Sequence, residues 1–453
     1  MINSIISAIG NNNSIYPLLV RDCGIEVPTK VYKTYQQNKD DKEIAYLATR
    51  ERIIDEYSTS AVWLGGIPLI ERVANYLIKK KKFNPEVNLK LYTEENGVQG
   101  LKYNIEKFKN IAGAEEAVKD LEKVLQNKEQ YKRLQGNKFI ATMAIPIALM
   151  GFVIPKAVFA LTASTRAKKE ALRKQREATT FNLPERNVAF SSRDVFDRFT
   201  LKRPKTISFN GGFAGAVCNL RTVDKMAITD GGYAVGRVAT ARKKNERIDL
   251  AFKMLGMMYL NFVAPKQIEK ILGKISKQIF NVDVDLDPII LGDKELKQAI
   301  LDNTLELPKS NSAKDLLEFV DNAKNSKTLF VKYASQFNKI KLLDNDVRDP
   351  RAYVDIKDLG AFRDSLYNFS ESIKKLKLKT NVGEKGSVAK LIKNYILKAR
   401  GAKTFNILAN VGLSSYLLAC VLPDLQFAFR ELVTGSKLEP GLIIDDKNKK
   451  KKA

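Results

Sequence analysis

Clusters of lysine and arginine beside apolar segments are the residues of this sequence best suited to a binding role. Cationic side chains next to apolar helices attract anionic lipid headgroups, at ~1 kcal/mol per residue near the surface. The alternative is that they are ordinary solvated helix ends. Their recurrence favours an anionic-surface site that comprises Lys79, Lys80, Lys81, Lys82, Arg166, Lys168, Lys169, Arg173, Lys174, Arg242, Lys243 and Lys244.

The chain as a whole is strongly basic, which favours the same kind of partner. Its 453 residues include 77 Lys and Arg against 51 Asp and Glu, for a formal net charge of +26. Such a charge attracts phospholipid surfaces, acidic proteins or nucleic acid. The basic runs lack interleaved aromatic residues for base stacking, and no helix-turn-helix or zinc pattern occurs. We therefore expect a phospholipid membrane as the partner, with an acidic protein or nucleic acid as alternatives.

Histidine, which many catalytic sites and metal centres use, is missing. The sequence contains no histidine, which excludes Ser-His-Asp and Cys-His catalysis and every His-ligated metal site. Cys23, Cys218 and Cys420 lie far apart in sequence and show no zinc-binding spacing. We therefore predict no catalytic residues, no cofactor and no metal, and we favour a protein that is not an enzyme.

Two apolar segments are long enough to cross a membrane. Residues 139–163 carry a single charge, at Lys156, and as a helix would extend ~38 Å, against ~30 Å for the hydrocarbon core. Residues 404–423 carry no charge and would extend ~30 Å. Residues 58–70 and 254–264 are shorter, which suits buried helices or helices that enter a membrane without crossing it.

A proline lies in each of these four segments or directly after it, following small and apolar residues. A helical proline has no N–H and clashes with the carbonyl four residues earlier, so it kinks or ends the helix. The pattern predicts helix kinks at Pro68, Pro155, Pro265 and Pro423. Two interpretations stay open: a degenerate repeat of kinked helical units, or four unrelated helix ends.

Two glycine clusters indicate places where helices approach each other closely. Gly211 and Gly215 are four residues apart, as are Gly232 and Gly236, and such small residues allow close helix packing. The alternative is a dinucleotide-binding turn, but Asn210 stands where that pattern needs its first glycine. Close packing is the prediction.

These features together predict a mostly α, membrane-associated helical protein with two to four proline-kinked apolar helices. A minor β element is expected at residues 281–286, where Val and Leu alternate with Asp. The predicted regions are 1–83 (helical, with a short apolar segment), 84–177 (helical, with the main apolar segment), 178–265 (glycine-rich linker and short apolar helix), 266–403 (polar helical domain) and 404–453 (apolar helix and Lys-rich tail).

The expected function is structural, scaffolding or lipid-binding, at the cytoplasmic membrane of a bacterium with the soluble parts mainly cytoplasmic. One alternative is a soluble basic helical protein that binds nucleic acid and uses its apolar segments as a core. A less favoured alternative is a nucleotide-using enzyme that depends on the glycine clusters.

Overall fold

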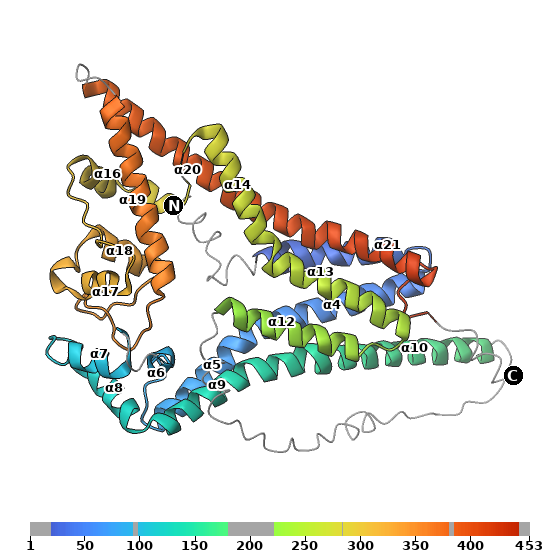
Figure 1. Cartoon of the computed structure of the whole chain (residues 1–453). Coiled ribbons are helices and arrows are strands. Elements are labelled where there is room, and N and C mark those ends of the chain that lie inside the picture. Colours follow the sequence, from blue (N-terminus) through green and yellow to red (C-terminus); the bar gives the residue numbers. More distant parts are fainter. Residues whose placement is uncertain (1–19, 94–97, 180–221, 283, 380–384, 444–453) are drawn as a thin grey trace.

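The protein is almost entirely helical in a computed structural model that describes residues 20–93, 98–179, 222–282, 284–379 and 385–443 (Figure 1). The mostly α prediction is therefore confirmed. Gly211 and Gly215 lie outside the described residues. Long helices form two arms, which converge around α4, α10, α13 and α21 and separate toward two smaller helical units (Figure 1).

The first half of the chain builds one arm around a helical hairpin. The short helix η1–α3 comes first, and the first long helix, α4–η2–α5, follows it. A small unit of three helices (α6, α7 and α8) then separates the first long helix from the second, α9–η3–α10, which runs antiparallel to it. The bounds are η1 Val20–Glu26, α3 Val27–Asn38, α4 Lys42–Ala61, η2 Val62–Gly66, α5 Ile67–Lys80, α6 Lys90–Thr93, α7 Leu101–Phe108, α8 Glu115–Gln126, α9 Lys128–Ala148, η3 Leu149–Val153 and α10 Ile154–Thr179.

The second half repeats this order of elements. A short helix, α12, precedes the helix pair α13–α14, a larger insert follows, and the long helix α20–η6–α21 returns. The bounds are α12 Thr222–Ala239, α13 Lys244–Phe262, α14 Ala264–Phe280, α15 Pro288–Leu291, α16 Lys294–Leu301, α17 Ala313–Asp321, η5 Ala323–Asn325, α18 Leu329–Gln336, α19 Ile356–Lys379, α20 Lys385–Tyr416, η6 Leu417–Val421 and α21 Leu422–Thr434.

The short helix of each half packs against the other half. Within the halves, α5 packs on α9 and α4 on α10, just as α14 packs on α20 and α13 on α21. Between them, α12 packs against α9 and η3 of the first half, and α3 packs against η6 and α21 of the second half. The two arms are thereby held together where they converge.

A π-helical turn stands directly before three of the four prolines that the sequence analysis singles out. η2 ends two residues before Pro68, η3 two residues before Pro155 and η6 two residues before Pro423, whereas the chain leaves the helix for one residue, Val263, before Pro265. A wider turn accommodates a residue that lacks an N–H and crowds the preceding turn. It also frees carbonyl groups, and the Lys33 amine donates to the Cys420 carbonyl at 3.1 Å.

The insert of the second half has its own apolar core, which α16, α17, α18 and α19 surround. We call residues 281–379 the polar domain. The strand expected at 281–286 is wrong, because its described residues form no strand and Asn281 has left-handed backbone angles (φ 50°). The alternation is nevertheless real: Val282, Val284 and Leu286 are buried in this core while Asp285 is exposed.

The polar domain contacts the small unit of the first half through buried charges. Arg348 is fully buried and forms an ion pair with Asp321, and it donates to the Asn104 side chain of α7 at 3.2 Å. Arg351 donates to Asp120 of α8 at 2.9 Å. These contacts join the two inserts at the ends of the arms.

Candidate functional site

Charged side chains, most of them buried and the others half-buried, gather where the two arms converge, and we call this group the polar junction. It lies between α3, α4, α12, α13 and α21 and comprises Glu26, Lys30, Glu51, Arg52, Asp55, Glu56, Arg237, Arg242, Glu246, Asp249, Lys253, Arg430 and Glu439. Burying a charge is costly unless it is paired and hydrogen-bonded. The junction satisfies this requirement through ion pairs that connect different helices.

Glu56 of α4 is the centre of one set of pairs. Its carboxylate accepts from the Lys253 amine of α13 and from the Arg52 guanidinium one turn earlier, both at 3.1 Å. The Lys30 amine of α3 lies 3.8 Å away and also bonds Glu26. Three helices are therefore tied to one carboxylate.

Two further carboxylates form buried ion pairs, one within the second half and one between the two halves. The Arg430 guanidinium of α21 donates to Asp249 of α13 at 3.1 and 2.8 Å, and Gln426 donates to the same carboxylate at 2.7 Å. Asp55 of α4 pairs with Arg237 of α12. Both pairs are almost completely buried, since no side chain in them is more than 8% exposed.

A cavity of about 50 Å³ opens into the junction beside Asp55 and Arg237. Within the described part of the chain, Asp55 Oδ1 and Arg237 Nε have no hydrogen-bond partner, although both residues line the cavity. One unmet acceptor and one unmet donor beside a space of this size fit a bound water. The junction is therefore suited to holding helices together, and among the described residues no group of Cys, Asp and Glu side chains is arranged to hold a metal ion.

The outer faces of the same helices are apolar. Large apolar side chains are exposed on α5, α9, α10, α13, α14, α20 and α21, among them Leu69, Val73, Leu77, Ile145, Leu161, Leu255, Ile271, Ile275, Ile279, Leu397, Phe405, Leu408, Leu413, Leu425 and Leu432. Lys156 of α10 interrupts this surface and is exposed. The arms thus combine charged side chains inside with apolar side chains outside.

Two helical runs are long and apolar enough to cross a membrane, residues 128–174 and 390–434. Only 28% and 33% of their most apolar windows are buried inside the protein. The core helix of a soluble protein is mostly buried instead. The shorter apolar segments at 58–70 and 254–264 are parts of the long helices α4–η2–α5 and α13–α14.

The basic residues singled out from the sequence divide into two kinds. Arg242 bonds both Glu51 and Glu246, while Arg166 and Lys243 donate to the carbonyls of Leu442 and Ile443. These three hold the fold together. The remaining residues are exposed: Lys79, Lys80, Lys81 and Lys82 at the end of α5, Lys168, Lys169, Arg173 and Lys174 on α10, and Lys244 at the start of α13.

The exposed basic residues of the first arm lie at its two ends. Because α5 pairs with α9 and α4 with α10, the end of α5 and the end of α10 point in opposite directions along the arm. Lys169 also lies over the ring of Tyr46, 4.7 Å from its centroid, and Lys174 is 3.3 Å from Glu170. The sequence-predicted sites are therefore not brought together into one patch.

The second glycine pair lies at a close contact between helices. A Cβ atom on Gly236 of α12 would be 2.8 Å from the Cα atom of Gly151 in η3, and one on Gly232 would be 2.6 Å from Ile147 of α9. Side chains larger than hydrogen would therefore separate α12 from the first arm.

No known protein family matches the chain, and no curated protein or solved structure is detectably similar to it.

Proposed function

We propose that this protein is an integral membrane protein that binds anionic phospholipid at the basic ends of its helices. The observation that carries the proposal is the inverted polarity of the two arms. Charged side chains such as Asp249 and Arg430 are buried between the helices, whereas side chains such as Phe405 and Leu432 are exposed. In water this arrangement would expose apolar area and bury charge at the same time.

A bilayer makes the same arrangement favourable. Apolar outer faces are then surrounded by hydrocarbon, and intramembrane charges face the interior of the bundle, where they pair with one another. Lys33 reaches the Cys420 carbonyl beside Pro423, which supplies the hydrogen bond that a proline-interrupted helix needs in a membrane. The two apolar runs meet the length requirement for a span.

The exposed lysines at the end of α5 are the strongest candidates for headgroup contact. Lys79, Lys80, Lys81 and Lys82 follow the exposed apolar residues Leu69, Val73 and Leu77 on the same helix. Apolar side chains in the bilayer followed by cations at its surface are the arrangement that binds anionic lipid. The role is structural: an anchored scaffold that carries the polar domain at the membrane.

Fractionation of cells that express the full chain tests membrane insertion. We expect the protein to stay in the membrane pellet through an alkaline carbonate wash and to be released by detergent. Release by carbonate would overturn integral insertion and indicate surface attachment, and recovery in the soluble fraction without detergent would overturn membrane association altogether.

A further inference from the structure

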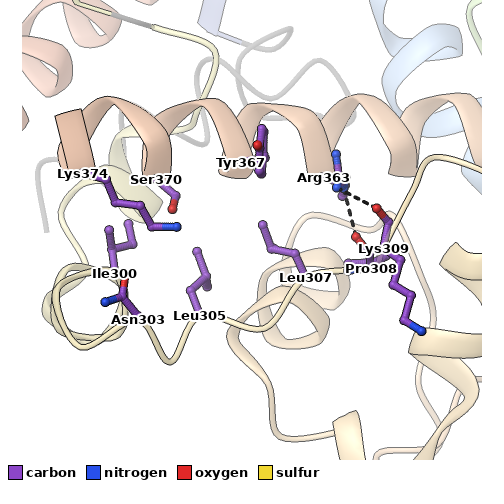
Figure 2. Close-up of a pocket in the computed structure, with 10 residues that line it drawn as sticks. All are labelled: Ile300, Asn303, Leu305, Leu307, Pro308, Lys309, Arg363, Tyr367, Ser370 and Lys374. Carbon is purple, nitrogen blue, oxygen red and sulfur yellow. Dashed lines mark hydrogen bonds between the residues drawn. The ribbon is translucent and has the colours of Figure 1, made fainter.

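A second cavity lies in the polar domain, away from the polar junction. It has a volume of about 280 Å³, near the lower end of the range for small-molecule sites. Figure 2 shows α19 along one wall and the extended segment 303–309 along the other. Ten residues line it: Ile300, Asn303, Leu305, Leu307, Pro308, Lys309, Arg363, Tyr367, Ser370 and Lys374.

The lining has a cationic and hydroxyl-bearing side and an apolar side. Three of the ten residues are cations and none is acidic. On α19 the residues Arg363, Tyr367, Ser370 and Lys374 follow one another at helical spacing, so they share one face. Figure 2 shows the Lys374 amine extended into the space between the walls. Opposite it lie the apolar side chains of Ile300, Leu305 and Leu307.

Arg363 is fixed in place by the opposite wall. Its guanidinium donates to the carbonyls of Pro308 and Lys309, both at 3.1 Å (Figure 2). It also donates to Asp364 at 3.0 Å. The Tyr367 ring lies 5.0 Å from the same guanidinium. These contacts hold segment 303–309 against α19 and keep the cavity open before any ligand arrives. Preformed sites of this kind lose little free energy to ordering.

Lys374 is the cation whose amine extends into the cavity (Figure 2). Its amine lies 3.1 Å from Glu371, one turn back on α19, which does not line the cavity. An i,i+3 pair on a solvent-exposed face is weak, so a phosphate oxygen can replace the carboxylate as the partner of the amine. Ser370 is buried and lines the same wall, and its hydroxyl offers a further donor.

We propose that this cavity binds a small phosphate-bearing anion with an apolar part. Lys374 and Ser370 would contact the phosphate, and Leu305 and Leu307 the apolar part. A volume of about 280 Å³ admits a phosphomonoester or a single lipid headgroup, and it excludes a nucleic acid strand. The proposal does not depend on membrane insertion of the arms.

Calorimetric titration of the full-length protein in detergent tests the site. The probes are inorganic phosphate, butyl phosphate and phenyl phosphate, and separately short-chain phosphatidic acid. Loss of one charge-assisted contact weakens binding roughly tenfold or more, which is the effect we expect for Lys374→Gln. Lys375→Gln is the matched control, since the exposed Lys375 is its neighbour and does not line the cavity. Lys374→Arg should restore most of the affinity.

The outcomes separate the two sources of phosphate. Lys374-dependent binding of the soluble esters supports a metabolite site, and Lys374-dependent binding of phosphatidic acid alone supports a headgroup site. Absence of binding for every probe would overturn the proposal. Equal losses in Lys374→Gln and Lys375→Gln would do so as well, because they would indicate attraction to net charge only.

Discussion

Replacing Arg430 should destabilise the helical arms through the carboxylates that it leaves unpaired. Its side chain is fully buried, donates twice to Asp249 and lies 3.0 Å from Glu439. Removal of one partner from a buried pair costs about 3–5 kcal/mol. Gln426 still donates to Asp249 at 2.7 Å, so we place Arg430→Met at the lower end, about 3 kcal/mol.

The assay is the free energy of unfolding in detergent, followed by circular dichroism during titration with a denaturing surfactant. The control is Arg430→Met combined with Asp249→Leu, which removes both charges of the pair. We expect the double variant to recover at least half of the loss, because a buried pair replaced by apolar residues of similar volume costs little. If the double variant were as unstable as the single one, the reasoning from unpaired charge would be refuted.

Three further predictions follow from other contacts. Gly236→Ala should destabilise the protein by about 1–3 kcal/mol, because the added Cβ atom forces α12 away from η3. The control is Gly231→Ala, where the added Cβ atom would have only the Met258 side chain near it, at 3.7 Å; it should be neutral or stabilising in the same unfolding assay. Replacing all four lysines at the end of α5 (Lys79, Lys80, Lys81 and Lys82) with Gln should lower the amount of anionic phospholipid that co-purifies by more than half. The control replaces four exposed lysines of the polar domain with Gln and should leave that amount unchanged: Lys294, Lys314, Lys324 and Lys327. Equal losses in the two variants would contradict a specific role for α5. Burial and the hydrogen bond to Asp293 raise the pKa of Tyr333, so this hydroxyl stabilises the fold fully below about pH 10 and progressively less above it. Tyr333→Phe should lower the free energy of unfolding by about 1 kcal/mol at neutral pH and reduce the fall of that free energy at alkaline pH. An unchanged fall at alkaline pH would show that Tyr333 is not its source.

The apolar segments and their prolines could be predicted from the sequence because both signals are local. Twenty-five residues with one charge at 139–163 identify a helix without any tertiary information. The full length of the helix α4–η2–α5 could not be predicted from hydropathy, because four charged residues interrupt its apolar pattern: Glu51, Arg52, Asp55 and Glu56. In the fold these four side chains point into the polar junction.

The polar junction itself could not be predicted. Asp55 and Arg237 are 182 residues apart, and Asp249 and Arg430 are 181 apart, so nothing in either segment indicates its partner. The one available signal was charge spaced three and four residues apart on otherwise apolar helices. The repeated order of elements was equally hidden, because the inserts between the long helices differ in size: three helices in the first half, and five helices with a 3₁₀ turn in the second.

The most direct test of the account asks whether lipid touches the outer face of the arms. Trp63 is the only tryptophan, so Trp63→Phe gives a silent background for single probes. In vesicles that contain brominated phosphatidylcholine, we expect strong fluorescence quenching for Phe405→Trp on α20, which is 60% exposed. Leu378→Trp on α19 of the polar domain, 83% exposed, should not be quenched. Equal fluorescence with brominated and plain lipid at residue 405 would contradict a membrane-embedded bundle.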